Sequence, residues 1–431
     1  MTSTEASLET ERVVAGGDAL ARHDSLVVFV PRALGGERVK ARLTIKGRLA
    51  RGDLLAVERA SPDRVVPPCE HYEADRCGGC QLQHASYSAQ LRIKADIVTE
   101  SMRRIGHVTA SPSDVRPSAT EWRYRRKLTL AIRRRGGEWI AGLRRMHAPD
   151  DVFSLNDCPI TAKEVVDVWR SVMRAAEFFP DSDRLRGAVR VTLDGAASFA
   201  LEGGESWDRA QEFVDAVPEL EGVWWTPDRG TRRLIGTDAD MSAEAVTASY
   251  PIDAADTIAP HASFAQINEA TSRALLDHVL GRVRVHKPRH VVDAYAGSGA
   301  ASSALDDDGV RVTAIELDDE AAQWTASSVS ERSSVMIARV EDALQEALPA
   351  DVLLMNPPRG GVHSRVCEVI GEHGGALKAI VYVSCDPATL ARDVARLPGW
   401  RVASMVCFDM FPQTAHVETV CELVPVVPAV A

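Results

Sequence analysis

The sequence predicts an α/β protein in which a C-terminal Rossmann-like domain follows a small N-terminal β-barrel and a central mixed α+β domain. After residue 290, apolar runs alternate with helical stretches, which is typical of a parallel sheet covered by helices. Between residues 10 and 60, short strand patterns are separated by glycines, which favours a small barrel. From about 115 to 240 the pattern is rich in strands but irregular. We place the domains at 1–62, 63–250 and 251–431.

The composition narrows the class of protein. The 431 residues are enough for about two to four domains. Apolar residues make up 45% and charged residues 26%, which excludes a wholly disordered or fibrous chain. The net charge, 50 basic minus 61 acidic residues or −11, argues against a polycation that coats nucleic acid. The start is polar and acidic, and no apolar run reaches the ~18 residues of a membrane span. We therefore expect a cytoplasmic protein with reduced thiols and no membrane partner.

The N-terminal unit rests on three strand patterns, at Val27–Val30, Val39–Ile45 and Leu49–Val57. Paired glycines at 16–17 and 35–36 mark its turns, and a proline-rich stretch at 61–69 closes it. A helix is predicted over about Tyr87–Ile105, and another over Asn268–Val283. The C-terminal strands are predicted at 291–294, 311–315, 351–355, 379–384 and 402–408.

A basic segment begins the irregular region. Nine basic residues and one acidic residue, Glu138, lie between Trp122 and Arg145, a local charge of +8 in an acidic protein. One interpretation is a solvated arginine-rich hairpin. The interleaved aromatic residues favour RNA instead, because bases stack on aromatic and guanidinium planes. We assign RNA contacts to the first four cations of the segment, which are Arg123, Arg125, Arg126 and Lys127.

The strand pattern HVVDAYAGSGA (290–300) leads into a glycine turn and a helix. Gly297 and Gly299 let the backbone approach a ligand at the start of that helix, with Asp293 and Tyr295 on the strand side of the turn. A lone Gly-x-Gly is a weak signal, and Ser302 excludes the dinucleotide pattern Gly-x-Gly-x-x-Gly. The alternative is a ligand-free domain whose turns simply need glycine.

Three further strand ends add to that signal. Glu316 ends the next strand, where an acidic residue is placed to hold ribose hydroxyls. Asp342, in VEDAL, can bond an adenine amine, and Asn356 follows another strand in LLMNPPRGG. All of these positions share the carboxyl edge of a doubly wound sheet, where ligands bind. Their order resembles that of S-adenosylmethionine-dependent methyltransferases, and the resemblance implies that cofactor.

Two motifs near the end of the chain suggest covalent catalysis. Cys385, in YVSCDPATLARD, lies between a strand and a helix N-terminus that favours its thiolate; the alternative is a buried structural cysteine. Glu418, in DMFPQTAHVETV, precedes the last strand. A thiolate that adds to C6 of uracil makes C5 nucleophilic, and a base must then remove the C5 proton so that the thiolate can leave. A thiol, a carboxylate and a methyl donor together meet these requirements.

The chain resembles, over nearly its full length, the bacterial RNA uracil-C5 methyltransferases, particularly the iron–sulfur enzymes that act on 23S ribosomal RNA. The motifs YVSCDPATLARD and DMFPQTAHVE carry most of this resemblance. It implies that residues 16–39 belong to a TRAM-like RNA-binding barrel, that Cys385 is the nucleophile and that Glu418 is the base. It also implies cofactor contacts at Gln266, Asp293, Tyr295, Gly297, Gly299, Glu316, Asp342 and Asn356, and a contact of Phe264 with the target base. Asn356 departs from the Asp of many members.

Three cysteines lie within the stretch CEHYEADRCGGCQLQH (69–84). Two residues separate Cys77 from Cys80, so one turn can present both thiolates to a metal. Four thiolates suit either zinc or an iron–sulfur cluster, and spacing does not choose between them. The resemblance implies Cys69 and Cys158 as the other two ligands and a [4Fe-4S] cluster as the occupant. We interpret Cys367, Cys407 and Cys421 as core residues.

These observations favour 5-methyluridine formation in structured RNA. Ribosomal RNA is the preferred substrate and transfer RNA the alternative; no obligate protein partner is evident. Asn-Pro-Pro also occurs in enzymes that methylate exocyclic amines, but these need no thiol nucleophile. The third hypothesis is a non-catalytic RNA-binding or assembly protein with a methyltransferase fold.

Overall fold

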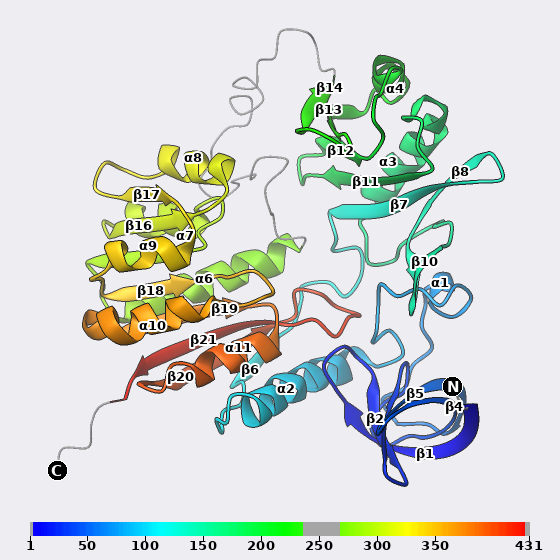
Figure 1. Cartoon of the computed structure of the whole chain (residues 1–431), viewed down its shortest axis with the longest axis horizontal. Coiled ribbons are helices and arrows are strands. Elements are labelled where there is room, and N and C mark those ends of the chain that lie inside the picture. The colour runs from blue at the N-terminus through cyan, green and yellow to red at the C-terminus, as the bar shows by residue number, and fades with distance from the viewer. Residues whose placement is uncertain (1–2, 236–267, 427–431) are drawn as a thin grey trace.

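The structure, a computed structural model, describes residues 3–235 and 268–426 (Figure 1). The first segment forms a closed barrel in the order β1-β2-β3-β5-β4. Its apolar core includes Leu8, Val28 and Leu43, all of which are buried. The N-terminal barrel is thus confirmed, and two strands extend it beyond the three predicted. Its strands are β1 (Ser3–Val13), β2 (Ala19–His23), β3 (Leu26–Val30), β4 (Arg38–Lys46) and β5 (Leu49–Arg59).

The next segment connects the barrel to the C-terminal domain. A short helix, α1 (Glu70–Glu73), is followed by α2 (Tyr87–Arg104), close to its predicted bounds, and by β6 (Asp114–Arg116). Val98 and Met102 of α2 pack into the core of the C-terminal domain, and β6 pairs in parallel with β20 (Trp400–Phe408). The boundary at 63–250 remains a prediction, but α2 and β6, which lie inside it, belong physically to the C-terminal sheet.

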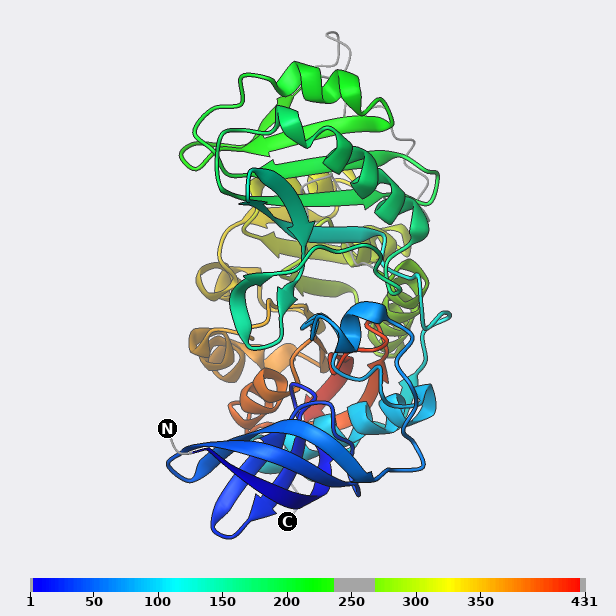
Figure 2. The ribbon, with the colours of Figure 1, turned by 90° about the vertical axis from the view of Figure 1, so that its right-hand side faces the viewer.

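The central region contains a sheet in the order β14-β13-β12-β11-β7-β8 and a small ribbon, β10-β9. Aromatic residues dominate its core, where Trp169 and Phe213 from two helices pack against Phe199 from the sheet. In Figure 2, α3 lies in front of this sheet and the C-terminal domain lies behind it. The elements are β7 (Lys127–Arg135), β8 (Glu138–Gly142), β9 (Arg144–Arg145), β10 (Ala148–Val152), α3 (Lys163–Arg174), η1 (Ala176–Phe178), β11 (Arg184–Val191), β12 (Ala197–Glu202), α4 (Ala210–Ala216), β13 (Leu220–Thr226) and β14 (Arg233–Ile235).

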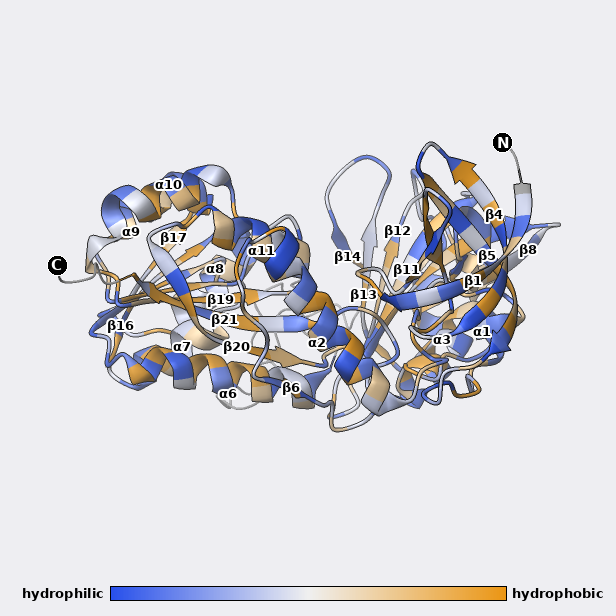
Figure 3. Cartoon of the chain, turned by 90° about the horizontal axis from the view of Figure 1, so that it is seen from below, coloured by the Kyte–Doolittle hydropathy of each residue, from blue (hydrophilic) through white to orange (hydrophobic). Residues whose placement is uncertain are grey.

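The C-terminal domain is a twisted sheet in the order β17-β16-β15-β18-β19-β21-β20-β6. Helices α6 and α7 pack on one face, whereas α2, α9, α10 and α11 cover the other. Figure 3 shows apolar residues along the inner strands, whereas the outer helices alternate between apolar and polar residues. The elements not yet given are α6 (Glu269–Val285), β15 (His290–Ala294), α7 (Ala300–Asp307), β16 (Arg311–Glu316), α8 (Asp319–Ser327), β17 (Ser334–Ile337), α9 (Val340–Ala347), β18 (Val352–Met355), α10 (Ser364–His373), η2 (Gly374–Ala376), β19 (Ala379–Ser384), α11 (Pro387–Ala395) and β21 (Glu418–Pro425).

The sheet is parallel only in part. Strands β16, β15, β18 and β19 are parallel as expected, and β17, which was not predicted, runs parallel to β16. By contrast, β21 runs antiparallel to both β19 and β20. The reason is the short connection: residues 409–417 contain no helix, and a parallel return needs a crossover of roughly a dozen residues or more. Among the described residues, no helix combines the length and apolarity needed to cross a membrane.

Candidate active site

The sheet brings Cys385 and Glu418 together. Cys385 directly follows β19, and Glu418 is the first residue of the antiparallel neighbour β21. Ser384 pairs with Thr419, so Cys385 and Glu418 are the next residues at the same end of this ladder. Helix α11 begins immediately afterwards, where the Asp386 carboxylate accepts hydrogen bonds from the Ala388 and Thr389 amides, both at 2.9 Å. This N-cap fixes the turn that carries Cys385.

The surroundings of Cys385 and Glu418 shift the pKa values of both side chains. Glu418 is only 4% exposed, and burial raises its pKa to about 7, against the opposing effect of the Arg359 guanidinium. Burial, and then the nearby Glu418 charge, raise the pKa of Cys385, while Arg359 lowers it. The stabilisation of the thiolate expected from the helix N-terminus is therefore outweighed by desolvation of Cys385 and by the charge of Glu418.

Arg359 was not among the predicted site residues. It belongs to NPPRGG, the motif from which Asn356 was chosen, so a signal for it was present in the sequence. It is the cation that lowers the pKa of both Cys385 and Glu418. A thiol and a carboxyl that titrate near one cation can act as a nucleophile and a base in the same reaction.

The predicted cofactor edge is built around Glu316. Its Oε2 accepts a hydrogen bond from the Gly297 amide, and its Oε1 accepts from the Leu317 and Asp318 amides, each at 2.8 Å. Tyr295, Gly297 and Gly299 all have positive φ angles, of 63°, 57° and 76°. A Cβ at Gly299 would lie 2.5 Å from the Thr325 side chain, so the turn requires glycine. The turn and the carboxylate thus form one rigid unit at the strand ends.

The other predicted contacts divide into two groups. Asp342, in the first turn of α9, and Asn356, just after β18, are exposed near this edge. Asp293 is instead buried, its pKa is raised to about 6 by burial, and its carboxylate accepts a 2.6 Å hydrogen bond from Ser302. Its observed contact therefore joins β15 to α7. Gln266 and Phe264 lie outside the described residues.

The basic residues chosen from the sequence hold the protein's own backbone and acids. Arg123 forms two hydrogen bonds with Asp157, at 2.8 and 2.6 Å. Arg126 donates to the Val191 carbonyl at 3.0 Å and to that of Thr192. Arg125 lines a cavity near the cysteines, and burial and neighbouring arginines lower the pKa of Lys127. Their role in RNA binding remains a prediction.

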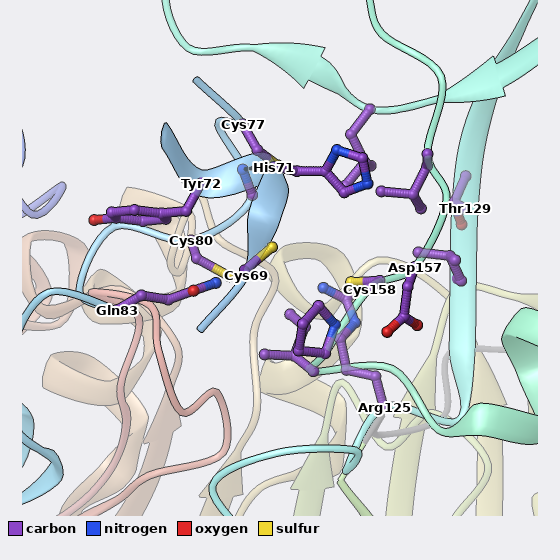
Figure 4. A pocket seen from close by; sticks show the side chains of 16 residues that line it. Cys69, His71, Tyr72, Cys77, Cys80, Gln83, Arg125, Thr129, Asp157 and Cys158 are labelled. Atoms are coloured by element: carbon purple, nitrogen blue, oxygen red, sulfur yellow. Dashed lines mark hydrogen bonds between the residues drawn. The ribbon is translucent and has the colours of Figure 1, made fainter. Parts of the chain in front are cut away.

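Cys69, Cys77, Cys80 and Cys158 line one cavity of about 70 Å³. Figure 4 shows the first three on one side of it and Cys158, with Arg125 and Asp157, on the other. The Gly79 amide donates a 3.4 Å hydrogen bond to the Cys77 Sγ, and burial raises the pKa of Cys77 to about 11. Within residues 3–235 and 268–426, no three His, Cys, Asp or Glu side chains are close enough to hold a single metal ion. By contrast, Cys367, Cys407 and Cys421 are buried in the C-terminal domain, as predicted for core residues.

Comparisons with known proteins identify relatives of this chain. Residues 236–424 match the model of the family described as tRNA (uracil-5-)-methyltransferase. An RNA methyltransferase of Halalkalibacterium halodurans is 30% identical over 96% of this chain and 95% of its own length, and one of Rhizobium meliloti is 29% identical over 96% and 98%. The crystal structure of Pyrococcus abyssi tRNA (uracil-54, C5)-methyltransferase in complex with S-adenosyl-L-homocysteine superposes with a TM-score of 0.68 at 19% identity. That match covers 97% of this chain and 100% of the other and shows a common fold.

Proposed function

Because this chain belongs to the family of bacterial RNA (uracil-5-)-methyltransferases, we propose that it converts uridine in a structured RNA to 5-methyluridine with Cys385 as nucleophile and Glu418 as base. The observation that carries the proposal is that these two residues lie at adjacent ends of β19 and β21, where one cation, Arg359, lowers the pKa of both. No redox step is required, because methyl transfer moves no net electrons.

The reaction proceeds in three steps. The Cys385 thiolate adds to C6 of uracil, which forms an S–C6 bond and places the electron pair on C5 and O4 as an enolate. C5 then takes the methyl group that bound S-adenosylmethionine would supply, with cleavage of its S–CH3 bond and S-adenosylhomocysteine as the leaving group. Glu418 then removes the C5 proton, the C5–C6 double bond forms again, and the C6–S bond breaks to return the thiolate. Because the target base must reach buried side chains, we expect it to leave its stack.

Support for the cofactor comes from the turn around Glu316. Its carboxylate is oriented by the amides of Gly297, Leu317 and Asp318, and a carboxylate at a second strand end suits ribose hydroxyls. Tyr295, Asp342 and Asn356 surround the same edge and would line the remainder of the cofactor site. The methyl donor would thereby lie at the carboxyl ends of β15 and β16, in the domain that also carries Cys385.

For RNA binding we favour the helix-free face of the central sheet. Strands β7 and β11 pair so that Lys127 lies opposite Arg190 and Arg133 lies opposite Arg184. Burial and the charge of Arg184 lower the pKa of Arg133. An open cleft beside it is lined by four arginines and two aspartates, which are Arg133, Arg134, Arg135, Arg184, Asp150 and Asp183. A surface that holds like charges together is stabilised by a bound polyanion. The TRAM-like barrel and the cysteines favour ribosomal RNA as the substrate, with transfer RNA as the alternative.

We also propose that the four cysteines hold a [4Fe-4S] cluster. Four thiols line the same cavity, and the amide of Gly79 donates to one of them, as amides do to cluster-bound sulfur. Zinc, which four thiolates also suit, is the alternative occupant. Anaerobic purification followed by iron, sulfide and zinc analysis tests this: about four irons and four sulfides are expected, and stoichiometric zinc would contradict it.

A covalent trap tests the catalytic proposal. RNA that contains 5-fluorouridine is incubated with the protein and S-adenosylmethionine and then analysed on a denaturing gel. Fluorine at C5 cannot leave as a proton, so a Cys385–RNA adduct should persist and should be absent with Cys385→Ala. If no adduct forms with ribosomal or transfer RNA although the cofactor binds, the thiolate mechanism is wrong, and amine methylation or a non-catalytic role gains weight.

A further inference from the structure

We propose that Gln413 is a positioning residue for Glu418, and that the cysteine-bearing segment Cys77–Leu82 holds Gln413 in place. The inference rests on the proposed function, because it concerns the step in which Glu418 removes the C5 proton. It makes the proton-removal step depend on a segment of the chain that precedes the base by more than 300 residues, as the separation of 334 between the bonded residues Gln81 and Ala415 illustrates.

The loop at residues 409–417 leads directly into Glu418. It connects β20 to β21 without a helix, yet Asp409, Gln413 and Val417 are almost fully buried. A loop without internal secondary structure must obtain its hydrogen bonds from elsewhere if it is to be rigid. The conformation of this loop, and with it the direction from which Glu418 enters the sheet, is therefore set by its contacts.

Gln413 makes more of these contacts than its neighbours. It is 2% exposed and has a positive φ of 71°, a conformation that a non-glycine residue adopts only when its surroundings enforce it. The backbone N–H of Gln413 donates to Gln90 Oε1, and the side-chain Oε1 of Gln413 accepts from Gln90 Nε2, both at 2.9 Å. The reciprocal pair fixes the side chain of Gln413 against α2.

The cysteine-bearing segment holds the other side of Gln413. The Gln413 carbonyl accepts hydrogen bonds from the amides of Gln81 at 3.1 Å and Leu82 at 2.9 Å, the two residues after Cys80. The Gln81 side chain extends the link, because its Nε2 donates to the Gly78 carbonyl at 2.9 Å and its Oε1 accepts from the Ala415 amide at 3.4 Å. Gln81 thus links the turn between Cys77 and Cys80 to the loop that precedes Glu418.

The barrel also contacts Gln81 and Ala415. A Cβ at Gly17, in the turn between β1 and β2, would lie 2.5 Å from the Gln81 side chain and 3.3 Å from that of Ala415. Gly17 also has a positive φ of 90°, so both space and conformation require glycine there. The barrel, the cysteine-bearing segment and α2 therefore all converge on residues 413–415, only a few positions before Glu418.

The order of the reaction steps makes a displaced Glu418 detectable. Cys385 attacks and the methyl group is transferred before Glu418 acts, so a displaced base leaves the methylated uracil bound to Cys385. Loss of Gln413 should then slow release but spare attack. A merely structural residue would affect both steps, because unfolding removes the thiol and the base together.

The test uses Gln413→Ala in the full chain, with Glu418→Gln as the reference for a lost base and Gln211→Ala, an exposed glutamine on α4, as the matched control. With ordinary uridine RNA and S-adenosylmethionine, Gln413→Ala should accumulate the covalent adduct and turn over about 10- to 100-fold more slowly. Its adduct with 5-fluorouridine RNA should form within about twofold of the wild-type rate. Gln211→Ala should behave as wild type in both assays.

Two results would overturn the inference: unchanged turnover of Gln413→Ala, or slowed turnover without an adduct on ordinary uridine RNA. If Gln413→Ala does not fold, Gln81→Ala removes the side-chain bonds to Gly78 and Ala415 from the other side and should show the same adduct to a smaller degree. If the wild type gives no 5-fluorouridine adduct, the proposed function fails first, so the two failures are distinguishable.

Discussion

Lys94 and Asp409 form an ion pair that is completely buried between α2 and the loop leading to the base. The Lys94 Nζ also donates to the Phe411 carbonyl at 3.0 Å, and the Asp409 amide donates to the Arg116 carbonyl at 2.9 Å. Burial lowers the pKa of Lys94, and the Asp409 charge opposes that effect. The pair thus connects α2, β6 and the end of β20 at a single point.

Removing Lys94 should destabilise the C-terminal domain strongly. Lys94→Met leaves the Asp409 carboxylate buried without its partner, which costs about 3–5 kcal/mol of unfolding free energy. Urea unfolding followed by circular dichroism measures the change. Arg92→Ala, which removes the exposed partner of Asp63, should cost no more than about 1 kcal/mol. A double variant, Lys94→Met with Asp409→Leu, should recover most of the loss; if it is no more stable than Lys94→Met, the unpaired charge is not the cause.

Product release should depend on pH near neutrality. The pKa of Glu418 is raised to about 7, and only the ionised carboxylate accepts the C5 proton, so release should slow below pH 7 by about tenfold per unit. Single-turnover decay of the adduct on ordinary uridine RNA, measured from pH 5.5 to 8.5, reports this step. Adduct formation on 5-fluorouridine RNA should follow the Cys385 thiolate instead, and it serves as the internal control. A release rate that is flat across this range would contradict the assignment of Glu418.

Arg359 should lower the pH at which the enzyme works. Replacing it with Met removes the positive charge that lowers the pKa of both Cys385 and Glu418. At pH 7 we expect turnover to fall by about tenfold, and the pH profile to move to higher pH, so that activity recovers as the pH is raised. Arg359→Lys keeps the charge and should retain most activity. Equal losses at every pH in both variants would point to a role in geometry rather than charge.

Glu316→Gln should weaken cofactor binding without preventing catalysis. Both carboxylate oxygens of Glu316 accept backbone N–H groups, so an amide at this position turns one N–H toward another. Calorimetric titration with S-adenosylhomocysteine should show affinity about tenfold lower, with kcat at saturating cofactor nearly unchanged. Glu320→Gln, which alters an exposed acid in the first turn of α8, is the matched control. Unaltered affinity in Glu316→Gln would exclude Glu316 from the cofactor site.

The helix-free face of the central sheet should bind RNA phosphates. Arg184→Ala removes an exposed cation from β11 and should reduce the slope of log affinity against log salt by about 1. Filter binding at several salt concentrations measures the slope. Arg170→Ala, on α3 at the opposite face of the same sheet, should leave the salt slope unchanged. If Arg170→Ala has the larger effect, the RNA lies on the helical side.

The sequence was most informative where the pattern was regular. Hydrophobic periodicity and glycine turns predicted β15, β16, β18, β19 and the barrel, because each strand has a continuous or alternating apolar pattern. β17 was missed because four residues between polar stretches carry too little signal. β6 was missed for a different reason: three residues become a strand only because β20 offers them an edge.

The site divides in the same way. Cys385 and Glu418 could be chosen because their motifs are specific, and the structure places them at adjacent strand ends. The raised pKa of Cys385 and the internal bond of Asp293 could not be foreseen, since both depend on burial that only the folded chain creates. Arg123 was chosen for its charge, but Asp157 satisfies it, and no local pattern reveals such a partner at a distance.

The position of β6 has a consequence for synthesis on the ribosome. Ser113, next to β6, donates a hydrogen bond to Met405, 292 positions later, and β6 completes an edge that includes β20. Domains generally fold as their segments emerge, at about 5–20 residues per second. The barrel and the central sheet can therefore form early, while α2 and β6 wait, with Val98 and Met102 still uncovered, until residues near 400 have been translated. This interval is when the nascent chain is most exposed to aggregation and would benefit most from a chaperone.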